Sequence, residues 1–220
     1  MRPAGVLLDV DGTLIDSNKA HAHAWFDALS EAGVSVEFAA VRHLIGMGGD
    51  KLLPAVADIN PESELGKAIT KRRGELFQTH YLPSIHAFPA VKQLLERMKR
   101  AGFALAIASS AKNAELDSLL RIAEADKFIK ARTSSDDADN SKPDPDIVQA
   151  ALARLGHPAE RVILLGDTPY DVAAGSKAGV RVVALRCGGW TDDELQGACC
   201  IYNDPLDLLN NFDESPFGEM

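Results

Sequence analysis

Four short apolar runs divide the sequence, and their order constrains the fold more than any other feature. Each is a nearly continuous stretch of hydrophobic side chains, and they cover residues 6–8, 103–108, 162–165 and 180–185. Runs of this kind predict strands buried on both faces, as in parallel sheets. Residues 128–133 form a weaker fifth candidate.

Amphipathic segments lie between the runs and predict helices over residues 90–102, 113–125, 145–156 and 171–179. Strands that alternate with helices are typical of an α/β fold. Right-handed crossovers then place helices on both faces of a parallel sheet. The sequence therefore predicts a doubly wound, Rossmann-like core.

One long stretch interrupts this alternation. Its pattern is helical throughout, with alanine at every fourth position from Ala20 to Ala32. We expect a small inserted α-helical domain over residues 16–86 and an α/β core formed by residues 1–15 and 87–220.

The composition narrows the class of protein. The chain has 220 residues, 46% of them hydrophobic, and a formal net charge of −9 at pH 7. A negative surface argues against nucleic-acid partners, which need basic surfaces. No stretch approaches the roughly 20 apolar residues of a membrane span. Three cysteines without a disulfide-framework spacing fit a reducing compartment. We expect a cytoplasmic monomer or dimer that binds neither nucleic acid nor membrane.

The first apolar run ends in two carboxylates, in the segment Asp9-Val10-Asp11-Gly12-Thr13. Ligands bind at the carboxyl ends of parallel strands. Two acids so close repel each other unless a cation neutralises them, and a hard divalent ion such as Mg²⁺ takes oxygen ligands. The alternative is a loop in which Asp and Gly only shape a turn.

Polar residues also follow the later runs. Asp167 and Asp171 come directly after the third run, where an Asp can also cap a helix. Ser109 and Ser110 close the second run, where a hydroxyl can bind an anion or cap a helix. Lys142 is either a solvated charge or a cation that offsets negative charge during phosphoryl transfer.

This set of residues resembles the haloacid dehalogenase-like (HAD) superfamily, and the resemblance covers nearly the whole chain. The family's motifs are DxDG[TV], a Ser or Thr, a Lys, and an acidic GDxxxD pattern, matched here by Asp9 to Thr13, Ser109, Lys142, and Asp167 with Asp171. The helical insertion looks like the family's first type of cap. The whole chain looks most like the phosphoglycolate-phosphatase and β-phosphoglucomutase branch.

The resemblance implies roles for the first motif. Asp9 would be the nucleophile and a metal ligand. Asp11 would be the general acid and then the base, with its backbone carbonyl on the metal, and Thr13 would help to hold the loop. A carboxylate nucleophile divides hydrolysis into two easier steps, and a second acid can stay protonated to serve the leaving oxygen.

The later motifs receive roles in the same way. Ser109, Ser110 and Lys142 would bind the transferring phosphoryl group. Asp167 would ligate Mg²⁺, and Asp171 would support that site as a further metal-binding carboxylate.

The cap offers candidate substrate residues. The spacing of His21 and Trp25 is similar to that of β-phosphoglucomutase-like members, in which the His assists the acid–base Asp. An interior histidine packed beside Trp25 is an equal alternative. Residues 71–73 are expected to form a solvated helix face.

A glycine-rich cap loop bears on substrate choice. Mutases place an Arg in this loop to hold a second phosphate, whereas this chain has Gly49, with Lys51 two residues on. That difference weakens the mutase interpretation. Arg42, His43 and Lys51 are candidate substrate contacts.

Two cysteine-containing segments lie near the end of the chain. Residues 187–190 follow the last apolar run and are expected to border the site, whereas Cys199 and Cys200 are expected to be buried packing.

The leading hypothesis is a Mg²⁺-dependent phosphatase that hydrolyses a small phosphorylated metabolite, of the phosphoglycolate or sugar phosphate type, through an aspartyl-phosphate. One alternative is a phosphosugar mutase of the same branch. A second is a non-catalytic member that binds or regulates.

Overall fold

A computed structural model describes residues 3–218. The strands within these residues form a single five-stranded sheet in the order β2-β1-β3-β4-β5. Every neighbouring pair is parallel. The strands are β1 (Gly5–Leu8), β2 (Ala104–Ile107), β3 (Val162–Gly166), β4 (Arg181–Leu185) and β5 (Cys200–Tyr202). The α/β fold with a parallel sheet, and the strands expected from the four apolar runs, are therefore confirmed.

The fifth candidate strand is wrong. A 3₁₀ turn covers Asp126–Phe128, and a second covers Ser135–Asp137. Between them the chain runs beside β2, where the N–H of Ile107 donates to the Ala131 carbonyl at 3.0 Å. The N–H groups of Lys130 and Thr133 donate to the Leu105 and Ile107 carbonyls at 2.8 and 3.0 Å, so this segment pairs with β2 over a few residues without forming a regular strand. The actual fifth strand, β5, has three half-buried residues, too short a pattern to stand out in the sequence.

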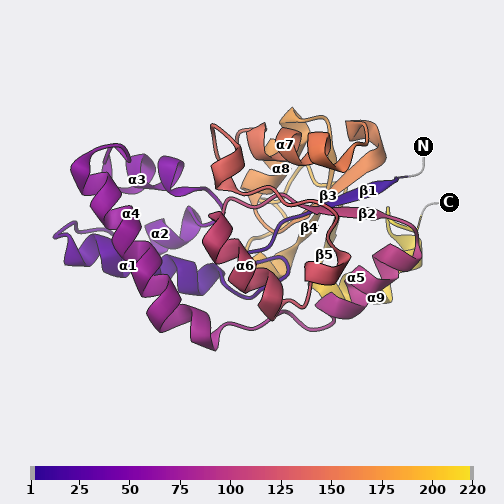
Figure 1. Cartoon of the computed structure of the whole chain (residues 1–220), viewed down its shortest axis with the longest axis horizontal. Helices are drawn as coiled ribbons and strands as arrows, with labels where there is room; N and C mark the ends of the chain where they lie inside the picture. Colours follow the sequence, from indigo (N-terminus) through magenta and orange to yellow (C-terminus); the bar gives the residue numbers. More distant parts are fainter. Residues whose placement is uncertain (1–2, 219–220) are drawn as a thin grey trace. The chain divides into compact units, whose positions relative to one another are not determined.

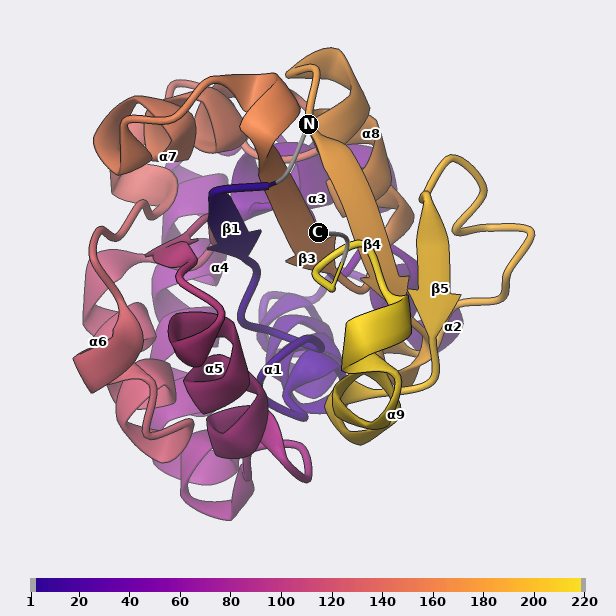
Figure 2. The same cartoon turned by 90° about the vertical axis from the view of Figure 1, so that its right-hand side faces the viewer.

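Helices cover both faces of the sheet, as Figures 1 and 2 show. One face carries α7 (Asp146–Leu155) and α8 (Pro169–Lys177), and the other carries α5 (Val91–Arg100) and α9 (Pro205–Asn210), which pack together. The helix α6 (Asn113–Ile122) follows β2 in the chain.

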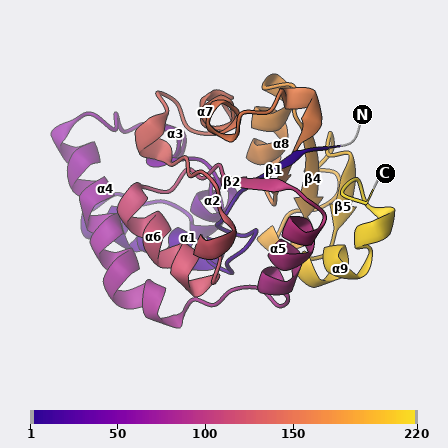
Figure 3. The ribbon, with the colours of Figure 1, turned by 45° about the vertical axis from the view of Figure 1, so that its right-hand side comes forward.

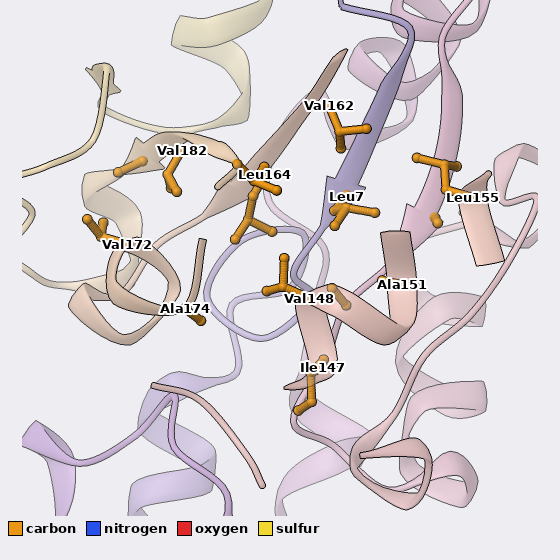
Figure 4. Packing of buried hydrophobic residues seen from close by; sticks show 14 of the residues in the cluster. Leu7, Ile147, Val148, Ala151, Leu155, Val162, Leu164, Val172, Ala174 and Val182 are labelled. Carbon is orange, nitrogen blue, oxygen red and sulfur yellow. The ribbon is translucent and has the colours of Figure 1, made fainter. Parts of the chain in front are cut away.

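The core beneath α7 and α8 is apolar and fully packed. Figure 4 shows Leu7 and Leu164 of the sheet meeting Val148 of α7, with Val172 of α8 beside Val182 of β4. Burying each such side chain stabilises the fold by about 1.5–3 kcal/mol. The strands are thus fixed firmly, and with them the points at which the loops at their carboxyl ends begin.

Residues Ser17–Ile85 form a separate compact unit, and the other unit comprises the described residues up to Asp16 and from His86 onward. The expected cap range differs from this unit by one residue at each end. The unit contains α1 (Asn18–Glu31), α2 (Phe38–His43), α3 (Gly49–Ala57) and α4 (Glu64–Leu76), and α4 continues into a π-helical turn at Phe77–Tyr81. Figure 3 shows α4 and α1, which pack against each other.

None of the helices within residues 3–218 is both long and apolar enough to cross a membrane.

Candidate active site

The register of the sheet brings distant motifs to one edge. Leu8 of β1 lies opposite Ile107 of β2 and Leu165 of β3, so these three strands end at the same level. The chain continues from those ends into the first, second and fourth motifs. The N–H of Asp9 still donates to the Leu165 carbonyl at 2.9 Å, which fixes the start of the first loop.

Three carboxylates gather at this edge. Asp9, Asp167 and Asp171 each place an oxygen within 4.8 Å of the others. Their exposed fractions are 6%, 0% and 1%. Asp11 is half-buried, and its side chain is not part of this group. Buried carboxylates so close together need positive charge, because burial and mutual repulsion both disfavour their ionised forms. The donor set therefore fits a hard divalent cation.

Lys142 supplies part of that positive charge. It is 1% exposed, and its Nζ lies 2.6 Å from Asp9 Oδ1 and 2.7 Å from Asp171 Oδ1. Burial by itself lowers the pKa of Lys142, but Asp171 and Asp9 outweigh it and raise that pKa above its usual range. Lys142 is thus a permanently charged group inside the site, and its interpretation as a solvated surface charge is wrong.

Asp171 has a second set of partners at the start of α8. Its Oδ2 accepts from the Thr168 N–H at 3.0 Å and from Thr168 Oγ1 at 2.7 Å, while its own N–H donates to Thr168 Oγ1 at 3.1 Å. This is a capping box, and Pro169 follows in the first turn. Asp171 therefore both caps α8 and holds Lys142.

Asp167 is held from the first motif. Thr13 Oγ1, fully buried, donates to Asp167 Oδ1 at 2.8 Å. A loop after β4 also touches both motifs, because Cys187 Sγ donates to the Gly12 carbonyl at 3.3 Å and Gly188 packs against the Asp167 carboxylate. This loop borders the site as expected. Buried packing is the wrong description of Cys199, which is exposed.

The second-motif serines differ from each other. Ser109 is 1% exposed, and its Oγ accepts from the Ala111 N–H at 3.1 Å, so it caps the turn before α6. Because that oxygen is the acceptor, its O–H hydrogen remains available to donate to an anion. Ser110 Oγ is buried and has no hydrogen-bond partner among residues 3–218.

The environment of Asp9 sets its ionisation. Burial raises its pKa, Lys142 lowers it, and Asp171 and Asp11 raise it again, which brings the pKa from 3.8 to about 7. A group whose pKa is higher in the folded state stabilises the fold below its unfolded pKa, and that stabilisation is lost as pH rises through the folded value.

We therefore expect the metal-free protein to lose stability between about pH 4 and pH 7 through Asp9, by a few kcal/mol at about 1.4 kcal/mol per pKa unit. Urea unfolding in chelator across this range measures it, with Asp9→Asn as the reference because that variant cannot titrate there. Parallel pH profiles for the two proteins would contradict the assignment.

In the helical unit, His21 lies in a packed cluster. It is 4% exposed, stacks on Phe77 with ring centres 4.1 Å apart, and its Nδ1 lies 2.5 Å from Arg73 Nη2. A guanidinium can only donate, so Nδ1 is the acceptor in this contact. The arrangement agrees with an interior histidine.

Arg73 was missed by the sequence analysis. Its guanidinium lies 5.5 Å from the Trp25 ring centre and 5.2 Å from that of Phe77, so residues 71–73 do not form a wholly solvated face. The spacing of four between Arg73 and Phe77 was the available signal, since such pairs are neighbours on a helix.

The other cap candidates lie on or near α2 and α3. Arg42 is half-buried and His43 is exposed in the last turn of α2. Gly49 begins α3, where a Cβ atom would lie 2.9 Å from Trp25 Cη2, and Lys51 follows in the first turns, half-buried. Their contact with substrate stays a prediction.

A family model described as haloacid dehalogenase-like hydrolase matches residues 6–185. The chain is 30% identical over 213 residues to a phosphoglycolate phosphatase of Aquifex aeolicus, covering 94% of this chain and 96% of that protein. A hydrolase structure from Pseudomonas syringae matches with a TM-score of 0.88 and 29% identity, covering 96% and 98% of the two chains. The structure of CbbY from Rhodobacter sphaeroides in complex with phosphate matches at a TM-score of 0.74 and 25% identity, covering 94% and 96%.

Proposed function

The chain belongs to the haloacid dehalogenase-like hydrolase family, and from this premise we propose that it is a Mg²⁺-dependent phosphatase of small phosphate monoesters that works through an aspartyl-phosphate. The observation that supports it most is the buried group of Asp9, Asp167 and Asp171 with Lys142 bonded to two of the three. Such a group can bind an anionic phosphoryl group through its positive charges and attack it with a carboxylate.

The cation would be held by Asp9, Asp167 and the backbone carbonyl of Asp11, with Asp171 in support. When bound, Mg²⁺ neutralises charge on the phosphoryl oxygens. Thr13 keeps Asp167 in place, as its hydrogen bond indicates.

The reaction has two displacements. The Asp9 carboxylate attacks phosphorus while the bond to the ester oxygen breaks, and Asp11 gives that oxygen a proton. Water then attacks phosphorus, Asp11 takes its proton, and Asp9 is released. Lys142, Ser109 and Ser110 would bind the phosphoryl oxygens during both steps.

The relatives support the proposed substrate class. A relative named phosphoglycolate phosphatase covers nearly the whole chain, which favours a small phosphorylated metabolite. The phosphoryl group is common to all such esters, so discrimination must come from other residues. We assign it to the cap, through Arg42, His43 and Lys51.

Removal of divalent cations is the direct test of this proposal. Exhaustive chelation should lower kcat/KM for an aryl phosphate by at least about 100-fold, because charge stabilisation at the reacting group is usually the largest catalytic term. Mg²⁺ should restore activity. Ca²⁺ should restore little, since its looser coordination disturbs in-line geometry. Full activity after chelation would refute the metal requirement, and no turnover of any phosphate ester with Mg²⁺ would favour a non-catalytic role.

Asp11→Asn tests the acid–base assignment. The variant should lose about ten times more activity on an alkyl or sugar phosphate than on an aryl phosphate, because a good leaving group needs less protonation. The measurement is kcat/KM for both esters in both proteins. Equal losses on the two esters would remove Asp11 from this role.

A phosphosugar mutase is the second candidate, because the resemblance includes that branch. Gly49 weighs against it, since Trp25 occupies the space of any side chain there and none is present to hold a second phosphate. Conversion of β-glucose 1-phosphate to glucose 6-phosphate with a bisphosphate primer would reverse the preference.

A further inference from the structure

We propose that the loop after β4, residues 186–190, is a positioning element for the metal site, and that Gly188 sets the affinity of that site for its divalent cation by fixing the Asp167 carboxylate. The inference rests on the proposed function, because it concerns that function's metal site. We call this segment the β4 loop.

The first observation is the space at Gly188. A Cβ atom built there would lie 1.9 Å from Asp167 Oδ2 and 2.6 Å from Asp167 Cγ and Cβ. Gly188 is not among the described residues with a positive φ, so its backbone is one that other residues adopt. The Asp167 side chain itself therefore excludes any larger residue at this position.

Asp167 has little freedom to give way. Its other oxygen accepts from Thr13 Oγ1 at 2.8 Å, and the residue is fully buried. Thr13 and Gly188 thus restrict the carboxylate at its two oxygens. A metal ligand held in this way loses less conformational freedom when it binds the ion. Residues that contact and orient the ligands therefore raise the affinity of the site for the metal.

The β4 loop is itself anchored. Arg186 donates to both Asp192 oxygens, at 2.6 and 2.9 Å, and to Asn203 Oδ1 at 3.0 Å. At the other end Trp190 is 5% exposed and packs edge-on against Tyr170, with ring centres 5.8 Å apart. A side chain at Gly188 would therefore strain both partners, because neither the loop nor the Asp167 carboxylate can move without losing contacts that hold it.

Cys187 links the same loop to the nucleophile turn. Its Sγ donates to the Gly12 carbonyl at 3.3 Å. One short loop thus contacts the turn that carries Asp9 and Asp11 as well as the carboxylate of Asp167.

The test is the affinity for Mg²⁺, measured by calorimetry at fixed pH in the absence of substrate, together with the melting temperature in chelator. Gly188→Ala should weaken Mg²⁺ binding at least about 10-fold, the loss typical when a residue that orients a metal ligand is changed. Gly74→Ala is the matched control, because a Cβ atom there meets nothing within 4 Å, and it should bind as the wild type does. A folded Gly188→Ala protein with wild-type affinity would overturn the inference.

Cys187 variants keep the test decisive if Gly188→Ala does not fold. Cys187→Ala removes the donor to Gly12 and should weaken Mg²⁺ binding severalfold, whereas Cys187→Ser keeps a donor and should lie closer to the wild type. Unchanged affinity in both would overturn the inference. If the wild-type protein binds no Mg²⁺, both the inference and the proposed function are overturned. If the wild type binds Mg²⁺ tightly and the variants bind it equally well, only the inference is overturned.

Discussion

Asp9→Asn is expected to lower kcat on any phosphate ester by about 10⁴-fold or more, because an amide cannot act as the nucleophile that forms the phosphoenzyme. The fold should survive, since Lys142 keeps its 2.7 Å ion pair with Asp171. The variant also replaces a buried carboxyl whose pKa is raised to about 7 with a neutral group of the same shape. Turnover measures the loss of kcat, and the melting temperature shows whether the fold survives. Acid-quench trapping shows whether a phosphoenzyme still forms.

The control for this experiment is Asp193→Asn, which changes an exposed aspartate on the same unit and should leave turnover unaltered. A folded Asp9→Asn protein that keeps a tenth of the wild-type kcat, or that still yields a phosphoenzyme, would exclude Asp9 as nucleophile.

Local patterns account for what the sequence could predict. The apolar run of β1 ends directly at Asp9, and that of β3 ends beside Asp167, so the meeting of these acids follows from a parallel sheet. The same reasoning applies to Ser109 after β2. Each of these predictions required only the position of a strand, the residue at which it ends, and the rule that the carboxyl ends of parallel strands lie at the same edge of the sheet.

Contacts between distant residues were beyond that reasoning. Lys142 and Asp9 are separated by 133 positions, and nothing in the loop around Lys142 distinguishes a buried ammonium from a surface one. Gly188 likewise resembles any loop glycine until Asp167 is placed against it. In the helical unit, Arg73 belongs to a run of charged residues, and such a run does not indicate that its guanidinium packs over Trp25. Burial of a polar group depends on tertiary partners that no local pattern records.

Lys142→Met is the second large expected effect, and it acts on stability as well as on activity. Removing one member of a buried ionic group leaves the others uncompensated, which typically costs about 3–5 kcal/mol. Here the uncompensated groups are Asp9 and Asp171, and Asp171 also caps α8. We expect metal-free Lys142→Met to be destabilised by that amount near neutral pH, and kcat to fall about 10³-fold, because a fixed cation at the phosphoryl group is lost.

Lys92→Met is the matched comparison, since Lys92 pairs with Glu124 at 2.6 Å but its side chain is 42% exposed. Such surface pairs contribute about 0–1 kcal/mol, so this variant should unfold and turn over almost as the wild type does. The cost of Lys142→Met should also shrink as pH falls toward about 7, because Lys142 lowers the pKa of Asp9, so its loss raises that pKa above the wild-type value and lets the carboxyl become neutral at higher pH. Denaturant unfolding of both variants at two pH values in chelator measures the difference. Equal, small destabilisation in the two variants would show that Lys142 contributes no more than a surface charge, and the electrostatic account of the site would have to be abandoned.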